Sequence, residues 1–121
     1  MKALTLTQPY ATLVALGAKH IETRSWATRY RGALASHAGA GLGPVGGKAG
    51  LWHQITVEPF YTVLKQAMIN CDDLLAARGH IVATCELVDC NAAPGYLHAG
   101  WRYDDGREWR LTAQERAFGD Y

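Results

Sequence analysis

The sequence has few cysteines and no cysteine framework. Its three cysteines, Cys71, Cys85 and Cys90, are an odd number and include no Cys-x-x-Cys pair. Disulfide scaffolds use paired cysteines, so this pattern indicates reduced thiols instead. No histidine and cysteine stand at the spacing of a zinc site, and we expect no bound metal and no cofactor.

The sequence also lacks a long apolar run and an excess of charge of either sign. No stretch approaches the roughly 18–20 apolar residues that span a bilayer, and the first residues are too polar for a signal peptide. We therefore expect no membrane partner and a cytoplasmic location. The net charge is only +1, so any basic surface must be local. Arg24, Arg29 and Arg31 form the one tight basic cluster.

The remaining composition is typical of one globular domain over residues 1–121. Hydrophobic residues make up 49% of the chain, enough for one modest core. Apolar spacing predicts strands over 3–7, 19–26, 33–37 and 80–90, helices over 9–16, 59–78 and 112–118, and a hairpin turn over 104–106. Thr112 is expected to cap the last helix, with Glu115 as its capping-box partner. Because no βαβ repeat is visible, we expect an α+β fold around a small mixed or barrel-like sheet.

A glycine-rich stretch begins at residue 39. The phosphate-loop pattern needs Gly, four residues and then Gly-Lys-Ser/Thr, but Leu42 stands where the first glycine belongs and Ala49 follows Lys48. We therefore predict a flexible loop region over 39–56 rather than a phosphate site.

Chemically capable side chains are most concentrated over residues 17–38. In a strand over 19–26, His20, Glu22, Arg24 and Trp26 would share one face. Such a face suits a cleft for a planar polar ligand, because Arg offers a fork of donors, Trp a stacking surface and Glu an acceptor. The alternative is a solvated sheet face with the indole half-buried at its end.

Glu86 lies in the middle of the predicted strand 80–90. Carboxylates are seldom buried unpaired, so either this face is solvated or Glu86 meets a cation, with Lys19 and Arg24 as candidates.

Several motifs together resemble the ASCH domain, a member of the PUA-like superfamily. The signature is Gly17-x-Lys19-x-x-Glu22-x-Arg24, and the flanking matches are residues 4–11, 26–32, 36–38 and 86–90. The resemblance is good over 4–38 and 79–90 and weak over 39–58 and 91–121. It implies a small PUA-like β-barrel with flanking helices and a cleft beside the signature. The family's usual last strand would follow residue 121, so we expect an open barrel edge that favours self-association.

The resemblance also implies handling of RNA, other nucleic acid or modified nucleosides. One group of small bacterial members is similar to amidohydrolases that deacylate N4-acetylcytidine with a Lys, a Thr and a Glu. The lysine corresponds to Lys19 and the glutamate to Glu86, but the threonine position holds Glu22. Other members are similar to single-strand ribonucleases or to nucleic-acid-binding modules.

Two hypotheses follow, and the binding module ranks slightly ahead of the hydrolase. In a binding module, arginines meet phosphates, Trp26 and Tyr30 stack on a base, and Gln8 and Glu22 read its polar edge. The predicted ligand-binding residues are Gln8, Arg24, Trp26, Thr28, Tyr30, Arg31 and His37. The partner would be a nucleoside or a short single strand of RNA, since duplex affinity depends on many phosphate contacts. Core packing of Trp26 or Tyr30 is the alternative.

In the hydrolase hypothesis, the predicted catalytic residues are Lys19, Glu22 and Glu86. Lys19 with a depressed pKa would act as nucleophile or base, and a carboxylate would move the proton. A regular strand would place Lys19 and Glu22 on opposite faces, so they converge only if the strand begins after Lys19. His20 and His37 are alternative bases.

Overall fold

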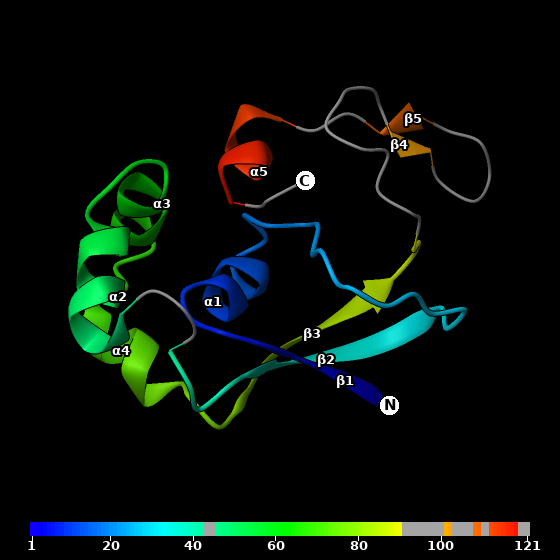
Figure 1. The fold of residues 1–121 in the computed structure, drawn as a ribbon, viewed down its shortest axis with the longest axis horizontal. Helices are drawn as coiled ribbons and strands as arrows, with labels where there is room; N and C mark the ends of the chain where they lie inside the picture. Colours follow the sequence, from blue (N-terminus) through cyan, green and yellow to red (C-terminus); the bar gives the residue numbers. More distant parts are fainter. Residues whose placement is uncertain (43–45, 91–100, 103–107, 110–111, 119–121) are drawn as a thin grey trace.

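One short helix lies between a group of helices and a small sheet (Figure 1). The structure is a computed structural model, and it describes residues 1–42, 46–90, 101–102, 108–109 and 112–118. Both helices and strands are present, so the predicted α+β class is confirmed.

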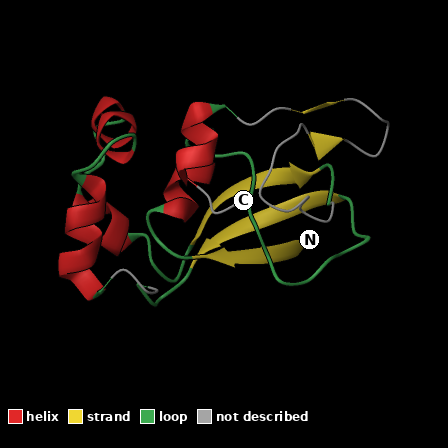
Figure 2. Ribbon diagram, turned by 45° about the horizontal axis from the view of Figure 1, so that its top comes forward, coloured by secondary structure: helices red, strands yellow, loops and turns green. Residues whose placement is uncertain are grey.

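The described strands of the main sheet are β1 (Lys2–Leu6), β2 (Gly32–Ala38) and β3 (Ile81–Leu87), in the order β1-β2-β3 (Figure 2). β1 pairs with β2 in parallel, and β2 pairs with β3 antiparallel. Leu4 stands opposite Ser36, so these two side chains share one face of the sheet.

The predicted strands over 3–7 and 33–37 are confirmed, and the strand predicted over 80–90 is shorter at both ends. Because β1 and β2 are parallel, they and the helix between them form one β–α–β unit, which the pattern of the sequence does not reveal. The described strands leave this sheet open, as a part of a barrel would be.

Helix α1 (Tyr10–Ala15) joins the sheet to the other helices and confirms the helix predicted over 9–16. It begins after Pro9, and the chain turns out of it at Gly17, whose φ of 73° suits a glycine. Its Ala11 packs with Leu6 and Ala38 of the strands. Its Leu13 is fully buried in a second cluster that the other helices form.

The second cluster draws on four further helices: α2 (Gly47–Ile55), α3 (Phe60–Gln66), α4 (Cys71–Ala76) and α5 (Ala113–Phe118). Its buried members are Leu13, Leu51, Ile55, Phe60, Leu64, Leu74 and Phe118. The expectation of a loop over 39–56 is therefore wrong for the residues of α2. Leu51 and Ile55 lie one turn apart, and their burial favours a helix despite the glycines.

The single helix predicted over 59–78 is wrong, because the structure breaks it into α3 and α4. Met68 lies at the break with a φ of 57°, which ends the helical path. Asn70 then starts α4 by accepting a hydrogen bond from the Asp73 backbone, and the Asp73 carboxylate accepts one from Asn70 N in return.

The prediction of a strand over 19–26 is also wrong. The segment has no regular secondary structure, and it joins no sheet. The backbone N–H groups of His20 and Ile21 donate to the carboxylate of Glu115 instead of to a neighbouring strand. A side chain thus satisfies backbone donors that a strand pairing would otherwise use.

Beyond β3, the strands β4 (Trp101–Arg102) and β5 (Glu108–Trp109) pair antiparallel, as the strands of a hairpin do. The hairpin turn predicted over 104–106 lies outside the described residues. The helix predicted over 112–118 is confirmed as α5. Within the described ranges, the helices are too short or too polar to cross a bilayer.

Candidate functional site

A cavity of about 920 Å³ lies between the sheet and the segment 19–30. Its floor includes the side chains of Leu4, Leu34 and Ser36, which the strand register places on one face. Residues of the ASCH-like signature form much of its wall. The volume falls within the range of roughly 300–1,000 Å³ that small-molecule sites occupy.

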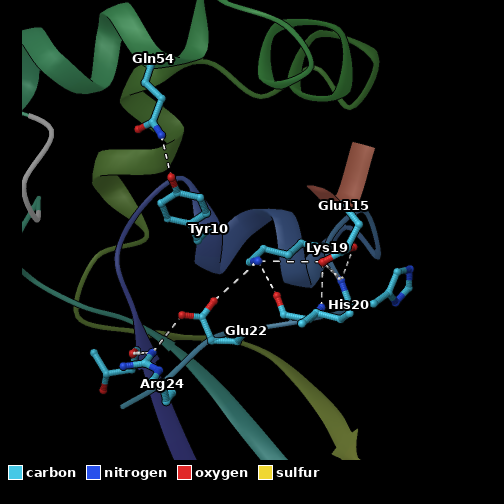
Figure 3. A network of polar contacts seen from close by, with 9 residues as sticks. Tyr10, Lys19, His20, Glu22, Arg24, Gln54 and Glu115 are labelled. Carbon is cyan, nitrogen blue, oxygen red and sulfur yellow. Dashed lines mark hydrogen bonds and ion pairs between the residues drawn. The ribbon is translucent and has the colours of Figure 1, made fainter. Parts of the chain in front are cut away.

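Lys19 is the buried cation of this wall, with a side chain only 2% exposed (Figure 3). Its Nζ donates to the backbone oxygen of Ile21. It lies 3.8 Å from Glu22 Oε2 and 3.9 Å from Glu115 Oε1. Two carboxylates and a carbonyl therefore surround the amine, and Tyr10 presents its ring at 5.9 Å.

Glu115 is a member of this network that the sequence prediction assigned only to a helix cap. Its carboxylate accepts hydrogen bonds from His20 N and Ile21 N, both at 2.9 Å, and its side chain is 3% exposed. Half of the predicted cap is present, because Glu115 N donates to Thr112 Oγ1 at 3.0 Å. An acid three residues before the core residue Phe118, on the same helical face, is the signal in the sequence that indicates burial.

Burial shifts the pKa values of two groups in this network. Burial lowers the pKa of Lys19 below its ordinary value, and the nearby Glu22 and Glu115 oppose that shift. Burial raises the pKa of Glu22, and the positive charges of Lys19 and Arg24 oppose that shift. Each group therefore moves toward its neutral form.

Arg24 extends the network to the sheet. Its Nη2 lies 3.5 Å from Glu22 Oε1 and donates to the backbone oxygen of Thr5 at 2.6 Å (Figure 3). Lys19, Glu22 and Arg24 thus form a chain of alternating charge. Lys19 and Glu22 converge because the segment is irregular, which removes the geometric obstacle that a regular strand would pose.

Aromatic side chains complete the wall. Trp26 lines the cavity with 54% of its surface exposed, so it is not a core residue. Tyr30 also lines the cavity, and its hydroxyl donates to Ala33 O at 2.5 Å. Thr28 fixes this turn by accepting from Tyr30 N at 3.0 Å.

Arg31 does not line this cavity. Its Nη1 donates to Thr28 O at 3.1 Å and to Tyr30 O at 2.9 Å, and its Nη2 lies 3.5 Å from Asp89 Oδ1. With Arg29 it lines a second hollow of about 540 Å³. Arg31 therefore shapes the turn, and Arg29 is the exposed arginine beside it.

A family model described as the ASCH domain matches residues 4–116. This chain belongs to the ASCH domain family. The match covers nearly the whole sequence and supports a nucleic-acid-binding or RNA-related domain. No curated protein and no solved structure matches the chain significantly.

The signature of this ASCH domain surrounds one place in the structure. Gly17 turns the chain out of α1, and the three charged signature residues that follow it form the network of Lys19, Glu22 and Arg24. The spacing of the signature is therefore the spacing that lets one irregular segment place three charges beside the cavity.

Gln8, predicted to read a base edge, is fully buried away from this cavity. Its Nε2 donates to Leu74 O at 3.1 Å, and its Oε1 accepts from Thr12 N and Thr12 Oγ1. Because the amide ties the start of α1 to α4, Gln8 is not available to a ligand.

The side chains of Glu86 and His37 project from the sheet face opposite the face that carries Ser36. Glu86 pairs across the strands with Ala33, one residue out of phase with the Leu34 of the cavity floor, and it is exposed. His37 Nδ1 lies 3.2 Å from Thr5 Oγ1 on that other face. Among the described residues, neither side chain contacts Lys19, Glu22 or Arg24, although Glu86 is one of the residues that line the cavity.

The described part of the ASCH domain holds no group of three or more His, Cys, Asp or Glu side chains arranged for a metal ion. The thiols of Cys71, Cys85 and Cys90 are free, and Cys85 is exposed at the cavity.

Proposed function

We propose that this ASCH domain binds single-stranded RNA or a modified nucleoside in the cavity beside Lys19, Glu22 and Arg24. The observation that carries the proposal is an exposed indole, that of Trp26, above an apolar floor and next to fixed charges. Single-stranded RNA is recognised by stacking splayed bases on aromatic side chains and by hydrogen bonds to their edges.

The charges support a short ligand. Arg24 and the exposed Arg29 lie along the segment that borders both hollows, where they can meet phosphates. The whole chain carries a net charge of only +1, so it offers few phosphate contacts for a long duplex. A nucleoside or a few nucleotides match this distribution.

The stacking residue can be tested with a matched pair of variants. Trp26→Ala removes the indole of the cavity, and Trp52→Ala removes one of similar exposure, 60%, on α2. We expect Trp26→Ala to weaken binding of a fluorescein-labelled single-stranded RNA by about 5- to 150-fold, the value of one base stack, and Trp52→Ala to leave it unchanged. Fluorescence anisotropy measures both. Equal affinities for the two variants would contradict the proposal.

A second candidate function is hydrolysis of an N4-acetylated cytidine to cytidine and acetate. The observation that favours it is an amine of lowered pKa, Lys19, beside a carboxyl of raised pKa, Glu22, at the cavity. Two observations favour the binding function instead: Lys19 is buried, and Glu86 is exposed without a contact to Lys19 among the described residues.

Incubation with N4-acetylcytidine separates the two functions. Release of acetate by the wild-type protein, lost in a folded Lys19→Arg variant, would support the hydrolase. Saturable binding without release of acetate supports the binding module.

A further inference from the structure

The floor of the cavity carries one polar side chain that the proposed function leaves unused. Ser36, on β2, is only 2% exposed, and its Oγ has no hydrogen-bond partner among the described residues. Nearly all buried polar groups of folded proteins have a partner, because a buried hydroxyl without one destabilises the folded state. The hydroxyl therefore calls for an explanation.

The strand register places Ser36 on the sheet face that lines the cavity. Ser36 stands opposite Leu4 of β1 and Ala83 of β3, so its side chain rises between apolar neighbours on the face that lines the cavity. A nucleobase laid against this floor would offer the polar atoms of its edge as partners to the hydroxyl.

The charged groups of the cavity wall already have partners of their own, so they do not serve as the partner of the Ser36 hydroxyl. Lys19 already donates to Ile21 O and is enclosed by Glu22 and Glu115. Arg24 donates to Thr5 O. The floor and the wall thus offer a ligand different chemistry: a hydroxyl that donates or accepts below, and charges at the side.

We propose that Ser36 Oγ is the hydrogen-bonding contact at the cavity floor for the polar edge of an inserted nucleobase. This inference rests on the proposed binding function and adds a residue that selects for the base rather than for the phosphate backbone. The hydroxyl has no partner among the described residues because the ligand supplies one.

The first test compares two hydroxyl deletions on the same sheet. Ser36→Ala removes the hydroxyl of the cavity face, and Thr84→Ala removes an exposed one from the opposite face. We expect Ser36→Ala to weaken binding of an oligouridylate of about 8 nucleotides by about 5- to 30-fold, with an unchanged or higher Tm. Thr84→Ala should not alter the affinity.

The outcomes separate this inference from the proposed function. If the wild-type protein binds neither the oligouridylate nor uridine nor N4-acetylcytidine, both are overturned. If it binds and Ser36→Ala binds equally well, only the role of Ser36 is overturned. A lower Tm for Ser36→Ala would reveal a structural partner of the hydroxyl and would also overturn the inference.

The second test asks whether the base itself reaches the floor. Cys85 stands opposite Leu34, whose side chain shares the sheet face of Ser36 and precedes it on β2. Cys85 is exposed. We expect the oligouridylate to slow alkylation of Cys85 by iodoacetamide at least several-fold relative to Cys71 on α4, as mass spectrometry measures. An oligomer with abasic sites should give no protection. Equal protection by the abasic oligomer would show backbone binding and overturn the inference.

Discussion

At the scale of single residues, the site depends on Lys19, a cation that the fold buries almost completely. One of its carboxylate partners, Glu22, lies close to it in the chain, and the other, Glu115, lies far along the chain on α5. The motif that contains Lys19, Glu22 and Arg24 predicts that these residues act together, and the structure brings them together. The motif does not indicate Glu115, because its role arises from contacts that only the folded chain makes.

The lowered pKa of Lys19 leads to a first prediction. The amine should lose its proton at a lower pH than that of Lys65, whose pKa is raised by its contact with the Tyr61 hydroxyl. Heteronuclear NMR titration of lysine side-chain carbons measures both midpoints in one sample. A midpoint of Lys19 at or above that of Lys65 would show that Glu22 and Glu115 outweigh burial.

The role of Glu115 leads to a second prediction. Glu115→Ala removes the acceptor of two backbone N–H groups and a partner of a buried cation, and it should lower the free energy of unfolding by about 2–5 kcal/mol. Glu115→Gln keeps one acceptor oxygen and should cost less. Arg116→Ala, at the exposed neighbouring position on α5, should change stability by less than about 1 kcal/mol. Urea unfolding compares the three variants. Equal losses of unfolding free energy in all three would contradict a stabilising role for the Glu115 carboxylate.

At the scale of elements, periodicity predicts the position of helices better than their ends. The apolar residues of α3 and α4 continue one pattern, so the sequence suggests a single helix over 59–78. The break at Met68 depends on backbone geometry that no side-chain pattern reports. Over 19–26, alternation suggests a strand, but the segment pairs with a carboxylate rather than with β1.

The break between α3 and α4 leads to a third prediction. Met68 is 88% exposed and holds a left-handed φ of 57°, which glycine adopts without the steric cost. Met68→Gly should therefore stabilise the domain by about 0.5–1 kcal/mol, whereas Met68→Ala keeps the steric cost and should be nearly neutral. The shift in the urea midpoint distinguishes the two, and a Met68→Gly variant less stable than Met68→Ala would contradict it.

At the scale of the whole molecule, α1 couples two clusters that the sequence alone does not separate. One cluster packs Ala11 against the sheet, and the other packs Leu13 among the helices. The described sheet is open, with β1 and β3 as its outer strands, so self-association through an edge stays a prediction. Arg24 already occupies the Thr5 carbonyl of β1, which leaves less of that edge to a second chain.

The stability of the whole domain should depend on pH through Glu22, which is a fourth prediction. Because its folded-state pKa is raised above the ordinary 4.5, the folded protein takes up a proton before the unfolded chain does as the pH falls. The contribution of Glu22 to the free energy of unfolding should therefore be fully present below about pH 4.5 and be lost as the pH rises through the folded-state pKa. Glu22→Gln lacks this component.

Urea unfolding at a series of pH values measures this effect as the wild-type stability minus that of Glu22→Gln. The difference should grow in favour of the wild type as the solution is acidified. A difference that is constant or that shrinks would indicate that Lys19 and Arg24 outweigh burial at Glu22.

The hydrogen bond from His20 N to Glu115 joins residues 95 positions apart in the chain, so the ribosome makes one partner well before the other. At about 5–20 residues per second, a ribosome needs roughly 5–20 s to make the stretch between them. During that time the nascent chain contains Lys19 and His20 but not yet Glu115, their partner on α5. The network around Lys19 is therefore completed only after residue 115 has been made.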